Sequence, residues 1–144
     1  MPIFEEVSPR PIIMGRLEHG KDLLEELTAV CRDRRVDLGR VEAIGAVSKA
    51  QIGYYDQEKK TYQFLTIEQP MEITGLLGNV SLKDGDPMVH AHVTLADSSG
   101  RVMGGHLAPG TIIFACEFII SPFDGPLFQR GLDKTTGLPL WNTD

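Results

Sequence analysis

The chain of 144 residues lacks several features that mark well-defined classes of protein. No stretch approaches the ~20 apolar residues that a membrane helix needs. The first residues, Met-Pro-Ile-Phe-Glu-Glu, have neither the basic region nor the apolar run of a signal peptide. We therefore expect a cytoplasmic protein with no membrane partner. Positive charge is also scarce, and a net charge of −6 argues against direct nucleic-acid binding, because phosphates attract a basic surface.

Cysteine is equally rare. The two cysteines, Cys31 and Cys116, lie in apolar segments and form no CxxC motif, so the sequence does not indicate a thiolate metal site. Buried free thiols in a reducing compartment are the simplest interpretation. Two common catalytic motifs are absent as well, since no glycine-rich phosphate loop leads into a helix and no Gly-x-Ser-x-Gly elbow occurs.

Histidines, by contrast, are clustered: three of the four lie within seventeen residues. His90 and His92 alternate with the apolar residues Val89, Ala91 and Val93. Alternation with a period of two predicts a strand with one apolar face, so both histidines should project from the other face, about 6.5–7 Å apart. Neutral imidazoles that converge on one face are a common way to hold a transition metal.

The position of His106 depends on the turn that precedes it. The segment Asp-Ser-Ser-Gly at 97–100 has the residues of a type I turn closed by a left-handed glycine bulge. A turn of this kind puts His92 directly opposite His106 on the same face. A plain two-residue loop would instead put His106 opposite Ala91, on the wrong face. The turn residues favour the first arrangement.

We interpret His90, His92 and His106 as a site for a divalent metal, with zinc as the expected ion and one position open to water or a small ligand. A polar strand face without metal is the alternative, since a His-x-His pair often lies at a surface. The fourth histidine, His19, is interpreted as a structural or rim residue. Glu117, in an otherwise apolar strand, is a weaker candidate for a general base or a further ligand. The sequence leaves open whether the protein is an enzyme.

The whole chain, 1–144, is expected to be a single α+β domain. Residues 21–35 have apolar residues at helical spacing, with acidic residues early and basic residues late, which predicts an amphipathic helix. The tail 121–144 is expected to be extended and not a strand. The remaining patterns predict an antiparallel or mixed sheet of about seven to eight strands, at 9–17, 41–47, 50–55, 61–67, 71–80, 88–95, 101–107 and 111–120.

One helix of this length, about 22 Å, is too short to cover both faces of such a sheet. The apolar character of both faces of residues 112–120 therefore requires a second cover, unless the sheet closes on itself. The C-terminal tail could supply part of this cover, and another subunit is the other candidate. We expect a homo-oligomer.

Several segments together resemble one known family. They are 43–47 (AIGAV), 50–56 (AQIGYYD), 71–80 (MEITGLLGNV), 89–93 (VHAHV), 104–107 (GGHL) and 128–138 (FQRGLDKTTGL). This combination resembles the PPC domain (plants and prokaryotes conserved domain), in its stand-alone prokaryotic form without an AT-hook.

The resemblance implies an antiparallel-sheet α+β fold, association as a homotrimer, and a metal site at His90, His92 and His106. In plants the domain is joined to an AT-hook in nuclear DNA-binding proteins. This chain is acidic and has no Arg-Gly-Arg-Pro core. The alternative function is a DNA-associated or protein-interaction regulatory module without enzymatic activity.

Overall fold

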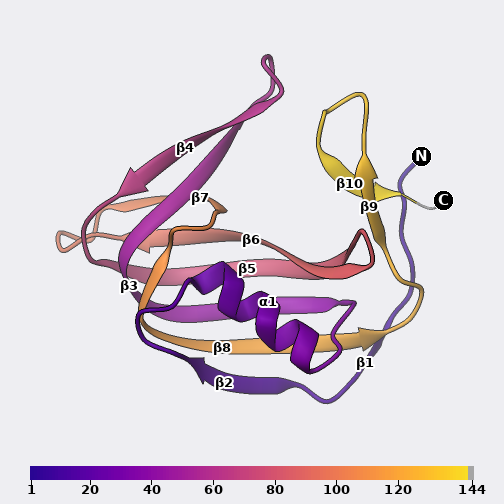
Figure 1. The fold of residues 1–144 in the computed structure, drawn as a ribbon, viewed down its shortest axis with the longest axis horizontal. Coiled ribbons are helices and arrows are strands. Elements are labelled where there is room, and N and C mark those ends of the chain that lie inside the picture. The colour runs from indigo at the N-terminus through magenta and orange to yellow at the C-terminus, as the bar shows by residue number, and fades with distance from the viewer. Residues whose placement is uncertain (143–144) are drawn as a thin grey trace.

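The computed structural model describes residues 1–142, and over this range it contains ten strands and one helix (Figure 1). The predicted architecture of an antiparallel or mixed sheet with one main helix is confirmed, but the predicted number of seven to eight strands was too low. The elements are β1 (Ser8–Pro9), β2 (Ile13–Leu17), α1 (Leu23–Asp33), β3 (Gly39–Asp56), β4 (Thr61–Ile67), β5 (Met71–Lys83), β6 (Asp86–Ala96), β7 (Val102–Leu107), β8 (Ile112–Asp124), β9 (Gln129–Leu132) and β10 (Pro139–Asn142).

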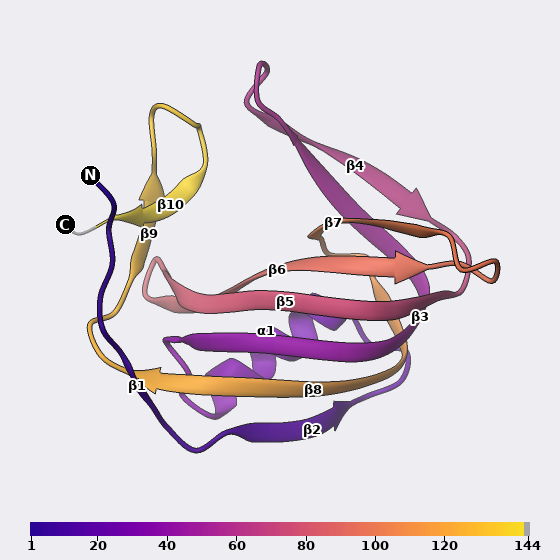
Figure 2. The same ribbon diagram turned by 180° about the vertical axis from the view of Figure 1, so that it is seen from behind.

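The helix α1 forms where the sequence predicted it and covers one face of the sheet (Figures 1 and 2). Its N-cap is Asp22, whose carboxylate accepts a hydrogen bond from the backbone N–H of Glu25 at 3.0 Å, which satisfies one of the free donors of the first turn. Leu23, Leu27 and Cys31 are fully buried against the sheet. Among the described residues, no helix is both long and apolar enough to cross a membrane.

The strand β3 is the centre of the sheet, because it pairs with four other strands. The sequence predicted two strands here, 41–47 and 50–55, whereas the structure has one strand of 18 residues whose register shifts three times. Such bulges bend a strand without ending it. The first half of β3 pairs with β5 and β8, and the second half pairs with β4 and β7.

Because β5, β6 and β7 pair in turn, the pairing of β7 with β3 closes the sheet on itself. This closure supplies part of the cover that the apolar strands require, as one of the sequence alternatives allowed. The opposite face, away from α1, is the outer face of the sheet. It exposes large apolar side chains, among them Met14 at 73%, Ile44 at 57% and Leu77 at 58%.

The C-terminal segment differs from the prediction of an extended tail without strands at 121–144. Strand β8 continues to Asp124, and β9 and β10 form an antiparallel pair whose first member adjoins β5. The last two residues of the predicted tail, 143 and 144, lie outside the described residues. These strands were missed because their pairing depends on distant parts of the chain and because the segment 121–144 contains three prolines.

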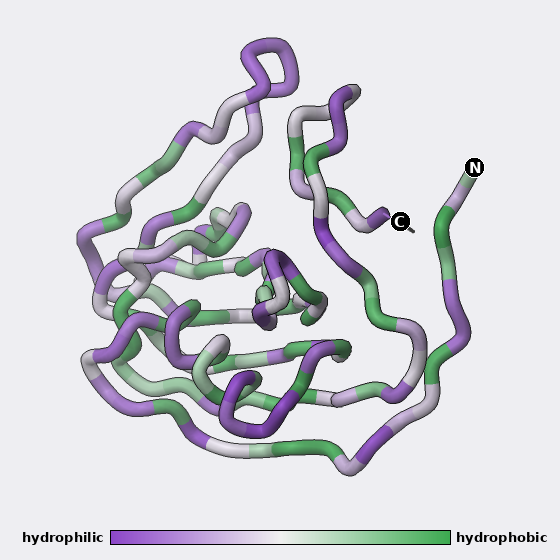
Figure 3. Tube along the Cα trace, turned by 45° about the vertical axis from the view of Figure 1, so that its right-hand side comes forward, coloured by the Kyte–Doolittle hydropathy of each residue, from purple (hydrophilic) through white to green (hydrophobic). Residues whose placement is uncertain are grey.

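The C-terminal segment also meets the hairpin of β3 and β4. The Tyr55 hydroxyl donates a hydrogen bond of 2.6 Å to the backbone carbonyl of Thr136, in the loop between β9 and β10. Figure 3 shows the hydrophilic tip of this hairpin rising beside the C-terminal loop. The hairpin and the loop therefore form the two sides of an arch over one part of the outer face.

Candidate metal centre

The turn between β6 and β7 places the third histidine as predicted. Asp97 and Arg101 are joined by a hydrogen bond of 2.9 Å from the Asp97 N–H to the Arg101 carbonyl, and the N–H of Gly100 bonds to the Asp97 carbonyl, also at 2.9 Å. Gly100 has a φ of 77°, a left-handed conformation that glycine adopts at little cost. In the resulting register, His92 lies directly opposite His106. The predicted turn and register are confirmed.

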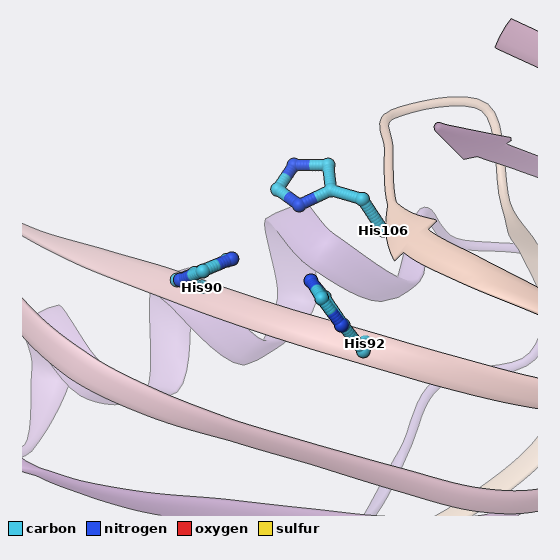
Figure 4. Close-up of side chains that lie close together, drawn as sticks. All are labelled: His90, His92 and His106. Carbon is cyan, nitrogen blue, oxygen red and sulfur yellow. The ribbon is translucent and has the colours of Figure 1, made fainter. Parts of the chain in front are cut away.

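The three histidines converge on the outer face of the sheet (Figure 4). The ring centroids of His90 and His92 are 5.3 Å apart, those of His90 and His106 are 5.2 Å apart, and those of His92 and His106 are 5.8 Å apart. One nitrogen from each ring can be chosen so that all three lie within 4.8 Å of one another. Figure 4 shows these nitrogens turned toward the space between the rings.

Burial disfavours protonation at this site. His90 and His106 are half-buried, whereas His92 is exposed. Desolvation lowers the pKa of His90 to about 4, with smaller contributions from the charges of Arg130, His106 and His92. Desolvation and the charge of His92 also lower the pKa of His106. At neutral pH, His90 and His106 therefore present the unprotonated nitrogens that metal binding requires.

One further observation tests whether the residues fit a metal. The Nδ1 atom of His106 is buried and has no hydrogen-bond partner among the described residues. A buried polar atom without a partner is costly, and such atoms often mark a site for an ion or water. Three imidazoles are also a donor set that zinc and related divalent ions accept in proteins. The residues present therefore fit a divalent transition metal.

The structure keeps the other sequence candidates apart from the triad. The exposed Glu117 lies on β8 opposite Arg16 and Ile44, and it is not part of the histidine cluster. His19 is exposed, and its Nδ1 lies 2.8 Å from the carbonyl oxygen of Phe114, consistent with a structural role.

Both cysteines are buried and free, as predicted. Burial is the main cause that raises the pKa of Cys31 to about 12 and that of Cys116 to about 11. Neither cysteine is therefore a thiolate at neutral pH, and neither carries nucleophilic chemistry.

Sequence reasoning missed the residues that surround the triad. Asn79 on β5 is the direct cross-strand partner of His90, and its side-chain oxygen accepts a hydrogen bond of 2.8 Å from Arg130 on β9. The ring centroid of Tyr62, on β4, lies 4.8 Å from that of His106. Arg130 belongs to one of the segments that carry the resemblance to the PPC domain, but no local sequence pattern indicated that it lies close to the histidines.

A cleft beside the triad offers space for a ligand. It has a volume of about 610 Å³ and is lined by apolar residues, by the polar residues His90, His92 and Asn79, and by the charged residues Glu5 and Arg40. This volume falls within the range of small-molecule sites, as does the mixture of apolar walls and a few polar groups.

The fold and the triad define a small α+β protein with a candidate centre of three histidines on the outer face of a closed sheet. The model of the Plants and Prokaryotes Conserved (PCC) domain, also abbreviated PPC, matches residues 4–124. The chain belongs to this family.

Two solved structures are similar over nearly the whole chain. A metal-containing protein from Archaeoglobus fulgidus is 41% identical, with a TM-score of 0.93 over 99% of this chain and 100% of that chain. A plant- and prokaryote-conserved protein from Pyrococcus horikoshii is 33% identical, with a TM-score of 0.93 over 99% of this chain and 98% of that one.

A longer relative contains a similar segment. The bifunctional protein GlmU of Synechococcus sp. (strain JA-3-3Ab) is 35% identical over 138 residues, which cover 90% of this chain and 21% of the relative. This chain thus spans about a fifth of the length of that protein.

Proposed function

We propose that this protein is a trimeric, cytoplasmic PPC-domain protein that holds one divalent metal ion, zinc, through His90, His92 and His106. The observation that carries the proposal is the convergence of three imidazole nitrogens beside the unpartnered Nδ1 of His106. The similarity to a metal-containing protein at 41% identity supports it.

Three protein ligands leave one coordination position for water or a small molecule. A zinc ion bound in this way supplies Lewis acidity and lowers the pKa of a bound water. The protein's own contribution is to hold two of the imidazoles neutral by burial and to provide a cleft next to them. This arrangement is compatible with chemistry on a small molecule.

The outer face of the sheet is the surface through which we propose that the trimer forms. Met14, Ile44 and Leu77 are each more than half exposed, and contiguous exposed apolar surface is typical of contact sites. A groove of about 620 Å³ runs between Met14 and Ile44. Burial of this face against other copies of the chain would remove apolar area from water.

Elemental analysis of protein purified without an affinity tag tests the metal site. We expect about one zinc per chain, and X-ray absorption should give Zn–N distances of about 2.0–2.1 Å. Protein that contains no metal, and takes up none when zinc is supplied at neutral pH, would rule the proposal out. We would then favour the regulatory-module alternative, in which the apolar outer face binds a protein partner.

A further inference from the structure

Arg130 is a positively charged side chain that has no acidic partner within residues 1–142. Its guanidinium donates to the hydroxyl of Ser81 from Nε at 2.8 Å, to the carbonyl of Pro139 from Nη1 at 3.0 Å, and to the amide oxygen of Asn79 from Nη2 at 2.8 Å. All three acceptors are neutral. Each ion pair that the described residues form involves another basic residue.

The surroundings hold the guanidinium in one orientation. The Cζ atom of Arg130 lies 5.4 Å from the ring centroid of Trp141. Trp141 in turn stacks on Phe128, with ring centroids 4.5 Å apart. The indole N–H of Trp141 donates to the buried hydroxyl of Ser81 at 3.0 Å, so the same oxygen fixes both Trp141 and Arg130. The positive charge of Arg130 is therefore half-buried and fixed in position, but no acidic group among the described residues neutralises it. Such a charge is preorganised to bind an anion.

The guanidinium retains capacity for such an anion. Arginine has five N–H donors, and these three hydrogen bonds use one on each nitrogen, so each terminal nitrogen keeps one free. Two such donors suit the two oxygens of a carboxylate.

Arg130 is also next to the histidine triad. It bonds to Asn79, which is paired with His90, and directly paired residues on one face of a sheet have Cβ atoms about 4.5–5.5 Å apart. A ligand that reaches from a metal at the triad to the guanidinium can therefore be small.

We propose that Arg130 and the metal held by the three histidines form a two-point site for a small organic acid. The carboxylate pairs with Arg130, and an oxygen on the neighbouring carbon occupies the open metal position. This inference rests on the proposed metal site for one of its two points. Tyr62 is a neighbour of the site, because its ring centroid lies 4.8 Å from that of His106.

Glycolate is the simplest probe, because it carries a carboxylate and an adjacent hydroxyl. Ethylene glycol is its neutral counterpart, and inorganic phosphate tests a different oxyanion. Binding is measured on the full chain, with and without zinc, by calorimetry and by the fluorescence of Trp141, which is the only tryptophan in the sequence. The zinc content is measured after each titration, so that removal of the metal by the probe is detected.

We expect glycolate to bind zinc-loaded protein at least tenfold more tightly than metal-free protein, and ethylene glycol to bind neither. Arg130→Gln should weaken glycolate binding by about tenfold to a hundredfold, the usual loss for hydrogen bonds to a charged group. The zinc content should not change. Arg32→Gln, the same substitution at an exposed site on α1, is the matched control and should bind glycolate like the wild type.

If the Trp141 emission shows that Arg130→Gln displaces the C-terminal strands, Arg130→Lys takes its place. Lysine keeps the charge but not the planar pair of donors, so the affinity should fall by at least fivefold. Unchanged glycolate affinity in the folded Arg130 variant, equal binding of ethylene glycol, or tighter binding of phosphate than of glycolate would each overturn the proposal.

The same measurements separate this inference from the metal proposal. Glycolate binding that needs Arg130 in a protein that takes up no zinc would refute the proposed metal function and leave Arg130 as an anion site. Stoichiometric zinc without glycolate binding would refute the organic-acid site and leave the metal site intact.

Discussion

Replacing His92 by alanine should remove metal binding and leave the fold intact. His92 is the exposed member of the triad, so its loss opens no cavity in the core. Surface substitutions of this kind usually change the free energy of unfolding by less than about 0.5 kcal/mol. The apolar faces of the sheet and α1, which hold the core, are untouched.

The effect on the metal should be large. Zinc sites with four protein ligands have apparent binding free energies of about 10–16 kcal/mol, or about 2.5–4 kcal/mol per ligand. Loss of one ligand then weakens binding about 10²–10³-fold. At a free zinc concentration of 100 times the wild-type Kd, zinc stabilises the native state by about 2.7 kcal/mol, whereas the variant would gain about 0.4 kcal/mol or less.

Thermal unfolding with and without zinc measures this difference. For a chain of this size, the wild-type midpoint should rise by about 5–11 °C with zinc and that of His92→Ala by no more than about 2 °C. His19→Ala is the control, because it removes the histidine outside the triad and should keep the wild-type response. Equal zinc-induced shifts in His92→Ala and the wild type would mean that the triad does not hold the metal.

Three further predictions concern the frame of the site. Gly104→Ala should weaken zinc binding although it changes no ligand. The Cβ of the new alanine would lie 2.5 Å from the Val93 carbonyl oxygen and would push β7 away from β6. Unchanged zinc affinity by calorimetry would contradict this prediction. Sedimentation at micromolar concentration should give three chains of 15.9 kDa, about 48 kDa, and Leu77→Asp on the outer face should shift the mass toward the monomer. Metal-free protein should lose stability as the pH falls from about 6.5 to about 4, because the pKa of His90 is lowered to about 4 in the folded state and the unfolded state therefore binds more protons in this window. Allowing for solvent screening, the loss should be about 1–3 kcal/mol in denaturant titrations, and His90→Gln should reduce it.

The sequence predicts the histidine hairpin well because its determinants are local. Alternating apolar residues define the faces of β6, and the residues at 97–100 define the turn, so the register of His92 with His106 follows from about twenty neighbouring positions. The helix α1 is predicted for the same reason, since its spacing, its acidic first turn and Asp22 are contiguous.

The features that were missed depend on distant contacts. Strand β3 was divided in two because Ser48 and Lys49 interrupt its apolar pattern, whereas the structure accommodates them by bulges. Strand β9 exists through its contact with β5, and Arg130 reaches Asn79 across 51 positions of sequence. Nothing near Arg130 or Tyr62 in the sequence specifies these partners.

The arch formed by the β3–β4 hairpin and the C-terminal loop has a consequence for the order of folding. The three histidines belong to a single hairpin, which closes a short loop and can form early, while the bond from Tyr55 to Thr136 joins residues 81 positions apart. The C-terminal strands are also the last part of the described chain to be synthesised. We therefore expect the histidine hairpin to form before Arg130 and the arch reach it, so that an ion could bind to the hairpin before the C-terminal strands are in place.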